Sequence, residues 1–230
     1  MLARIPLRVQ LFLLCLAPAF GTAASAATVE DWNKLQLQTD TYRFSRDKQK
    51  ALVAAQAEMK MAEELGPLPR NLEMIESSSV TLAGVLESNK RYPEAAAARL
   101  RGLTLHAKYR GKDSPHLCIP LTSLAKTYTA MGKHAEAEAA LKRVVEIKAK
   151  VDPDHQSGAL MNLGQHYAAQ KRYDDAEASF KRVLLQYEKE GGPNNPRLKP
   201  VLGLLSQMSS AAGRPRDAQA YTMRAARIRD

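Results

Sequence analysis

The stretch Leu163-Gly164-Gln165-His166-Tyr167, which continues with Tyr173-Asp174-Asp175-Ala176 and Phe180, decides the fold. Its pattern is a Leu, a small residue and an aromatic residue, followed by an Ala that lies 13 residues after the Leu. Further copies begin at Leu82, Leu124 and Leu205, and each has its Ala at the same distance. The copies are offset by 42, 39 and 42 residues. A fixed period of this length predicts stacked helical hairpins and argues against a single-domain enzyme.

Each copy predicts two helices joined by a short polar or glycine-bearing turn. In the second helix, Ala176, Phe180 and Val183 recur at helical spacing and form one apolar face. Short turns make neighbouring helices antiparallel. Ser114 and Asn195 each precede a proline in the longer loops, so we expect both to cap helices. The repeats thus predict an all-α fold.

Small residues recur where the two helices of a hairpin are expected to approach closely. On the first helices they are Ala83, Ala125, Gly164 and Ser206, and on the second helices Ala95, Ala137, Ala176 and Ala218. A larger side chain at these positions would push the helices apart.

A weaker helical pattern precedes the four copies. Thr28 and Asp31 have the spacing of a capping box, and residues 48–65 carry apolar side chains at helical spacing before Gly66 ends the run. We predict a degenerate helical hairpin over residues 27–70, followed by four repeats over residues 71–230, of which the last is a C-terminal cap.

The chain begins with the features of a secretory signal peptide. Arg4 and Arg8 precede an apolar run over residues 9–20 and a small-residue stretch that ends at Ala26. The apolar run is shorter than the ~20 residues that span a bilayer. We therefore expect residues 1–26 to be removed by cleavage near Ala26 and the mature protein to be secreted, with the periplasm as its compartment. An uncleaved membrane anchor is the alternative.

One cysteine, Cys118, remains after such a cleavage, because Cys15 lies within the segment that is lost. A single thiol cannot form an internal disulfide, so the apolar core must stabilise the mature chain. We interpret Cys118 as a small apolar residue near a helix start rather than as a nucleophile.

The repeats resemble the tetratricopeptide repeat family. The matching residues are Leu82, Ala95, Leu124, Ala125, Tyr128, Ala137, Leu163, Gly164, Tyr167, Tyr173, Ala176, Phe180 and Ala218. The period exceeds the usual ~34 residues, and the long repeats with their Pro-rich loops resemble the kinesin-light-chain type of the family. The resemblance implies an α-solenoid of about five antiparallel hairpins wound as a right-handed superhelix. It implies protein binding and says little about the partner.

In this family the first helices line a concave groove, and the resemblance transfers the groove to this chain by position. The groove positions lie two residues before, two after and five after the Leu of each copy. They are Val80, Gly84 and Glu87; Thr122, Lys126 and Thr129; Met161, Gln165 and Ala168; and Gly203, Gln207 and Ser210. The candidate partner-binding residues are Thr122, Lys126, Thr129, Met161, Asn162, Gln165 and Gln207.

Asn162 and Lys126 each leave two interpretations open. Asn162 matches a position where family members often use Asn to hold a ligand's backbone, to which an amide offers both a donor and an acceptor. Alternatively, it bonds only within its own repeat. Lys126 is either the partner of a carboxylate on the ligand or a solvated surface lysine.

The chain is basic, with a formal net charge of +10, and removal of residues 1–26 leaves 32 basic and 24 acidic residues. The excess gathers near the C-terminus in Arg197, Lys199, Arg214, Arg216, Arg224, Arg227 and Arg229. We interpret this basic patch as a solvated cap, with docking onto an anionic lipid or cell-wall surface as the alternative. We do not expect nucleic acid as a partner, because Tyr221 is the only aromatic residue in the patch that could stack on a base.

The sequence contains no motif for catalysis. It has neither a phosphate-binding loop nor a Gly-x-Ser-x-Gly motif, and no two of its five histidines are three or four residues apart. Acidic residues such as Asp174 and Asp175 lie at the starts of second helices, where they favour the helix dipole. We therefore expect no enzyme activity, metal or cofactor, and predict an exported scaffold that binds a protein or peptide. The partner and the oligomeric state stay open.

Overall fold

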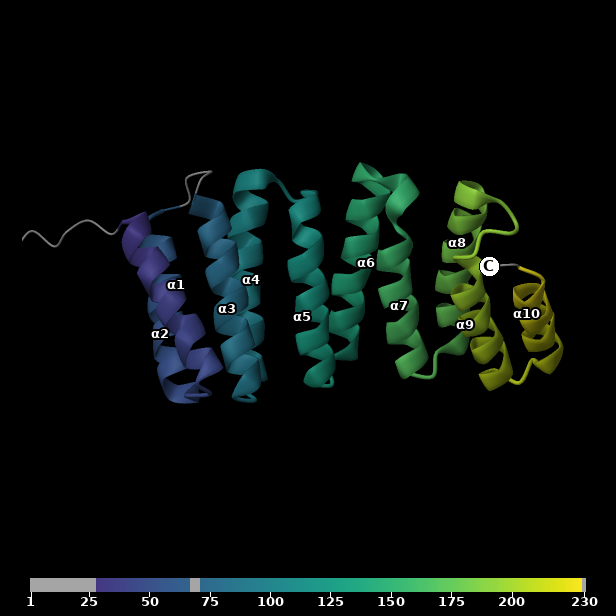
Figure 1. Ribbon diagram of the computed structural model, residues 1–230, viewed down its shortest axis with the longest axis horizontal. Helices are drawn as coiled ribbons and strands as arrows, with labels where there is room; N and C mark the ends of the chain where they lie inside the picture. The colour runs from purple at the N-terminus through teal and green to yellow at the C-terminus, as the bar shows by residue number, and fades with distance from the viewer. Residues whose placement is uncertain (1–27, 67–70, 229–230) are drawn as a thin grey trace, which may run out of the picture.

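The computed structural model describes residues 28–66 and 71–228. These residues form ten α-helices in five consecutive hairpins and contain no strand (Figure 1). The hairpins pair α1 (Val29–Phe44) with α2 (Lys48–Glu64), α3 (Leu72–Ser88) with α4 (Tyr92–Arg110), α5 (Cys118–Ala130) with α6 (His134–Val151), α7 (Ser157–Ala169) with α8 (Tyr173–Gly191), and α9 (Leu198–Ala211) with α10 (Pro215–Arg227). Short 3-10 helices, η2 (Pro115–Leu117) and η3 (Pro153–His155), lead into α5 and α7. The predicted all-α solenoid of five hairpins is confirmed, while the predicted signal peptide, its cleavage near Ala26, and Arg229 lie outside the described residues.

All five hairpins turn in the same way. In each turn one residue has a φ of 60–75°, and the N–H of the following residue donates to the carbonyl five residues earlier. The positive-φ residues are Arg46, Lys90, Gly132, Lys171 and Gly213, and the accepting carbonyls are those of Tyr42, Leu86, Tyr128, Tyr167 and Ser209. The turns therefore place all five hairpins in one register.

This register shows how the first hairpin departs from the others. Gln38 occupies the position of the repeated Leu, Thr39 that of the small residue, and Ala51 that of the repeated Ala. Thr39 and Ala51 are buried as their counterparts are, whereas Gln38 is exposed. A polar residue is tolerated there because no earlier hairpin among the described residues covers this face of α1.

The small residues sit where the two helices of a hairpin meet. Ala83, Ala95, Ala137 and Ala176 are completely buried. At Gly164 an added Cβ would lie 2.5 Å from Cε1 of Phe180, which is itself fully buried in α8. The close approach predicted for these positions therefore holds at Gly164 for a direct steric reason.

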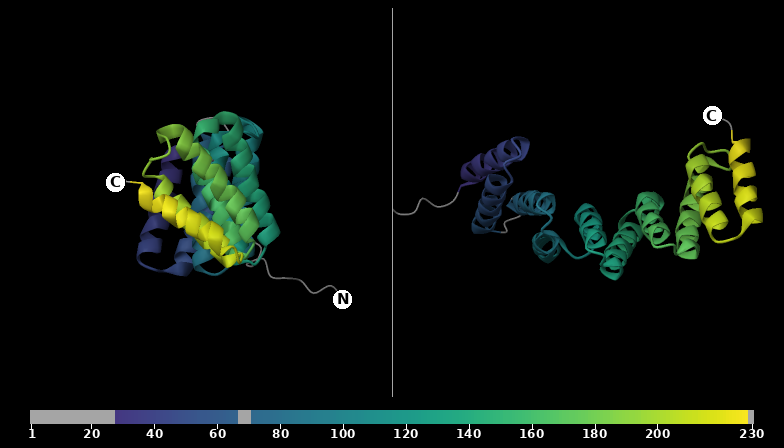
Figure 2. Two further views of the ribbon diagram at one scale, coloured as in Figure 1. Left: turned by 90° about the vertical axis from the view of Figure 1, so that its right-hand side faces the viewer. Right: turned by 90° about the horizontal axis from the view of Figure 1, so that it is seen from below.

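The hairpins stack into a curved ladder whose two ends rise in the same direction from its middle (Figure 2). The inner side of the curve carries first helices such as α5 and α7. The largest apolar cluster runs from α4 to the end of α10, and smaller clusters join α1 and α2 to α3 and α4. Among the described helices, none combines the length and the apolar character needed to cross a bilayer.

Arginines at one repeated position tie successive hairpins together. Arg101, Arg143, Arg182 and Arg224 follow one another at the same offsets of 42, 39 and 42 residues as the repeats. Arg101 and Arg224 contact Glu63 and Glu188 of the preceding hairpin, whereas Arg143 and Arg182 contact Asp113 and Gln156 in the loops that lead into their own hairpins. We call these four contacts the arginine ties. Three of the ties are partly exposed ion pairs, each of which contributes little by itself, about 0.2–1 kcal/mol, and the fourth, from Arg182, is a 3.3 Å hydrogen bond to a neutral amide.

A second repeated contact joins the last three hairpins near their turns. Glu138 at the start of α6 accepts hydrogen bonds from Tyr167 (3.0 Å) and from Arg172, both in the fourth hairpin, and pairs with Lys142 at 2.7 Å. One repeat later, Glu177 is bonded in the same way by Arg214 and pairs with Lys181 at 2.7 Å. These carboxylates hold each hairpin to the next.

Several local predictions can be compared with the structure. Thr28 and Asp31 form the predicted capping box of α1. Cys118 is the first residue of α5 and is buried, and burial raises the pKa of its thiol. Ser114 occupies the N-cap position of the 3-10 helix η2, but its side chain makes no capping bond, and its hydroxyl lies 3.1 Å from Nε2 of His106. Asn195 precedes α9 by three residues, and its side chain accepts the N–H of Arg197 without capping the helix itself.

Candidate functional site

The candidate site is the row of exposed side chains on the first helices, on the inner side of the curve. Lys126, Asn162, Gln165 and Gln207 are all exposed there. None of the four forms a side-chain hydrogen bond or ion pair within the described part of the chain. For Asn162, no hydrogen bond of its amide within its own repeat is present among the described residues. These side chains are free to contact another molecule.

The other predicted groove residues are partly engaged in the fold. The hydroxyls of Thr122 and Thr129 donate to the carbonyls of Cys118 (2.8 Å) and Ala125 (2.9 Å), one turn earlier in α5. Met161 is half-buried against the main apolar cluster. Thr122 and Met161 therefore form part of the floor of the groove and are less available to a ligand than the four exposed residues.

Glycines at groove positions differ from glycines in the core. A Cβ added to Gly84, Gly158 or Gly203 would meet no atom within 4 Å. By contrast, Gly102 and Gly164 face Ser79 and Phe180 at distances that exclude a Cβ. The groove glycines thus have no packing role within the fold, and they leave helix backbone open to whatever lies in the groove.

Glu87, predicted as a groove position, has its carboxylate engaged within the fold. Its carboxylate accepts two hydrogen bonds of 3.0 Å from Arg99 and one of 2.5 Å from the hydroxyl of Thr127. Arg99 is only 7% exposed, so the charge of Glu87 is needed to balance a buried guanidinium. Glu87 joins the second hairpin to the third and is not available to a ligand.

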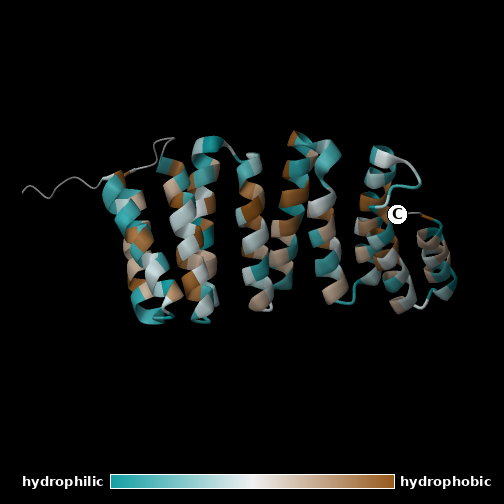
Figure 3. Cartoon of the chain, viewed as in Figure 1, coloured by the Kyte–Doolittle hydropathy of each residue, from teal (hydrophilic) through white to brown (hydrophobic). Residues whose placement is uncertain are grey.

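Sequence reasoning missed the most exposed apolar side chain of the groove. Ile119, near the start of α5, is 78% exposed, and Val80 of α3 is 46% exposed. In Figure 3 the upper half of α5 is hydrophobic and its lower half is pale to hydrophilic. The signal was available, because Ile119 lies three and seven residues before Thr122 and Lys126 and hence on the same face of the helix.

The predicted basic patch does not assemble into one uncompensated surface. Arg197 pairs with Glu190 at 2.7 Å, and its guanidinium lies 4.0 Å from the ring centre of Tyr187. Arg214 pairs with Asp174 at 2.7 Å and with Glu177, and Arg224 pairs with Glu188. Three of the seven basic residues of the patch are therefore matched by acids of α8.

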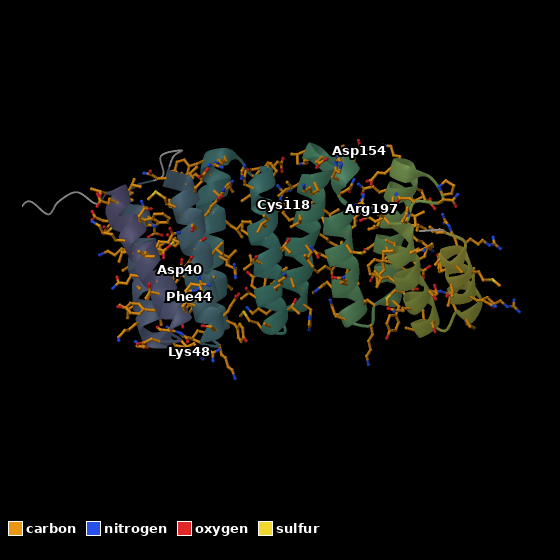
Figure 4. All side chains as sticks on the ribbon, viewed as in Figure 1. Asp40, Phe44, Lys48, Cys118, Asp154 and Arg197 are labelled. Atoms are coloured by element: carbon orange, nitrogen blue, oxygen red, sulfur yellow. The ribbon has the colours of Figure 1, made fainter. Side chains whose placement is uncertain are left out.

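The patch is also divided in space. Arg197 lies at the upper end of the stack, where Figure 4 labels it, and Arg214 follows the opposite end of α9. A helix of 14 residues, about 21 Å long, separates them. Arg216 and Arg227 are exposed without an ion pair among the described residues, and Lys199 is half-buried at the start of α9. This arrangement gives the anionic-surface alternative no support.

The described histidines and acids do not converge on a metal site. Within residues 28–66 and 71–228, no group of three or more His, Cys, Asp or Glu side chains could hold a metal ion. The rings of His106 and His116 lie 5.8 Å apart, and those of His134 and His166 lie 6.1 Å apart. His106 is buried and contacts Glu76 and Ser114, and burial lowers its pKa, aided by the charges of Arg110 and His116.

Comparison with known proteins places the chain among helical repeats. The family model described as tetratricopeptide repeat matches residues 74–150 and 156–230. No curated protein matches the chain by sequence.

Solved structures agree on the fold. A putative kinesin light chain from Podosopora anserina with nearly identical TPR-like repeats is 20% identical, with a TM-score of 0.67 over 86% of this chain and 95% of that one. BtubC (BKLC) from P. vanneervenii is 22% identical, with a TM-score of 0.65 over 86% and 80%. A MamA protein is 15% identical, with a TM-score of 0.56 over 84% and 89%. At these identities the similarity concerns the fold alone.

Proposed function

Because the chain belongs to the tetratricopeptide repeat family, whose members are generally protein-interaction scaffolds, we propose that it is an exported scaffold that binds another protein or peptide along its inner groove. One observation carries the proposal: the polar groove residues Lys126, Asn162 and Gln165 are exposed and make no contact that the fold requires. Since the groove is preformed, the partner bears most of the ordering cost on binding.

The mode of binding follows from what the groove offers. Asn162 and Gln165 present amide donors and acceptors, which suit the main chain of an extended segment. Lys126 adds one charge, and the open backbone at Gly84 and Gly203 admits close approach. Nothing in this set of groups activates a nucleophile or stabilises a developing charge, so the function we propose is recognition rather than catalysis.

A pull-down from the native compartment tests the groove. We expect the variant Lys126→Ala/Asn162→Ala/Gln165→Ala to lose the partners that the wild-type protein captures. The matched control, Gln56→Ala/Lys108→Ala/Gln219→Ala, removes the same number of amides and charges from exposed positions on second helices and should retain them. Equal recovery of every partner by both variants would rule out the groove.

Export is part of the proposal and rests on the sequence of residues 1–26. We expect the protein recovered from outside the cytoplasm to begin near Ala27, as N-terminal sequencing or intact mass would show. A protein that still begins at Met1 or Leu2 would contradict cleavage.

A further inference from the structure

A depression of about 410 Å³ lies between α3, α4 and α5, at the end of the groove away from Asn162 and Gln207. The residues that line it include Glu76, Val80, His106, His116, Ile119 and Pro120. Its volume is sufficient for one or two large side chains. None of the polar groove residues discussed above lines it.

One wall of the depression is apolar. Its exposed large aliphatic side chains are Val80 and Ile119, and Leu103 lies buried behind them. At the positions equivalent to Ile119, the next two hairpins carry Gly158 and Pro200. The hairpins therefore share their buried positions but differ at this exposed position. Of these three hairpins, the third alone has a bulky aliphatic residue at it.

The opposite wall holds a carboxylate in a fixed position. Oε1 of Glu76 contacts Nδ1 of His106, and Nε2 of the same ring lies 3.1 Å from the hydroxyl of Ser114. Burial lowers the pKa of His106, aided by the charges of Arg110 and His116, which favours the neutral ring. Among the described residues Glu76 is paired with no lysine or arginine, and its carboxylate lies against the imidazole ring.

Glu76 is the acid that a ligand can use. Its side chain is 24% exposed, whereas the neighbouring carboxylate of Glu73 is shared with Arg110 at 3.5 Å. A fixed negative charge beside exposed aliphatic carbon is complementary to a cationic side chain that neighbours a bulky apolar one. It repels an acidic segment by the same argument.

We infer that the α3–α5 depression binds a partner segment in which a Lys or Arg side chain neighbours a bulky aliphatic residue. The cation faces Glu76, and the aliphatic side chain covers Ile119 and Val80. This inference rests on the proposed function, because it names the chemistry of the segment that the groove takes. In this arrangement the α3–α5 depression selects the partner's side chains, while the part of the groove around Asn162 binds the partner's main chain.

The inference is tested with short, end-blocked fluorescent peptides whose central pair is Arg-Leu, Glu-Leu or Arg-Ser in a common Gly/Ser background. Fluorescence anisotropy with the purified protein should show Arg-Leu binding about tenfold more tightly than either of the others. Glu76→Gln, which preserves the acceptor for His106, should reduce Arg-Leu affinity about fivefold. Ile119→Ala should reduce it by a similar factor.

Two controls separate recognition from folding. Leu185→Ala removes another strongly exposed aliphatic residue, 63% exposed, from α8 and should leave the affinity within about twofold. Circular dichroism of Ile119→Ala should match the wild type, because the side chain is mostly solvated. Equal affinity for Arg-Leu and Glu-Leu, no binding of Arg-Leu, or no effect of Glu76→Gln and Ile119→Ala would each overturn the inference.

The outcome is distinguishable from failure of the proposed function. If the pull-down partner is lost in the Lys126→Ala/Asn162→Ala/Gln165→Ala variant but no peptide preference exists, the groove stands and the α3–α5 inference falls. If partner capture is unaffected by that variant, the proposed groove itself falls.

Discussion

At the scale of single residues, the glycines separate what the fold needs from what it does not. Gly164 is required because Phe180 occupies the space that a Cβ would take. Gly84 and Gly203 lie within helices but face open space. A helix-interior glycine costs about 0.5–1 kcal/mol relative to alanine. Their presence therefore has no explanation in packing and is consistent with contact to another molecule.

This contrast gives a stability prediction. Gly84→Ala and Gly203→Ala should each raise the free energy of unfolding by about 0.5–1 kcal/mol, because alanine favours the helix and meets no neighbour. Gly164→Ala should lower it by about 1–3 kcal/mol through overpacking against Phe180. Urea unfolding followed by circular dichroism measures all three, and a shift of Gly84→Ala and Gly164→Ala in the same direction would contradict the assignment.

At the scale of elements, hydrogen bonds and ion pairs connect one hairpin to the next. Burial alone would raise the pKa of Glu138, but the bonds from Lys142, Arg172 and Tyr167 outweigh it and lower the pKa from 4.5 to about 2. Only the ionised form can accept all of these bonds. The connection between α6 and the fourth hairpin therefore depends on the charge of a single carboxylate that is 16% exposed.

The pH dependence of this connection follows from the sign of the shift. Since the pKa is lower in the folded protein than in the unfolded chain, Glu138 stabilises the fold above about pH 4.5 and loses this contribution as the pH falls toward 2. At pH 7, Glu138→Gln should be less stable than the wild type by about 2–3 kcal/mol. The difference should shrink between pH 4.5 and 2, as urea unfolding of both proteins would show. A difference that is constant from pH 7 to pH 3 would refute this role.

Apolar contacts within a hairpin could be predicted from the sequence, whereas contacts between hairpins could not. The repeated Leu, Ala and Tyr positions are set by packing within a hairpin, so their spacing predicted the fold and the interior. The partners of Glu87 are far from it in sequence: Arg99 lies 12 residues away in the same hairpin, and Thr127 lies 40 residues away in the next hairpin. No local pattern distinguishes such a residue from a solvated one.

At the scale of the whole molecule, the polar and apolar parts of the groove lie at different places along the ladder. The polar groups Lys126, Asn162 and Gln207 belong to the third, fourth and fifth hairpins. The exposed aliphatic wall and Glu76 lie where the second hairpin meets the third. The groove positions derived from the family resemblance contained Val80 but not Ile119 or Glu76, because a fixed register assumes that every copy uses the same residues.

The arginine ties have a mechanical consequence for this ladder. Three of the ties are ion pairs exposed enough for salt to weaken them, whereas the partner of Arg182 is the neutral amide of Gln156. Dissolved ions therefore weaken the three ion-pair ties together. Because small changes of angle add up along a stack of hairpins, we expect ionic strength to alter the curvature of the ladder and the distance between Glu76 and the polar groups beyond it.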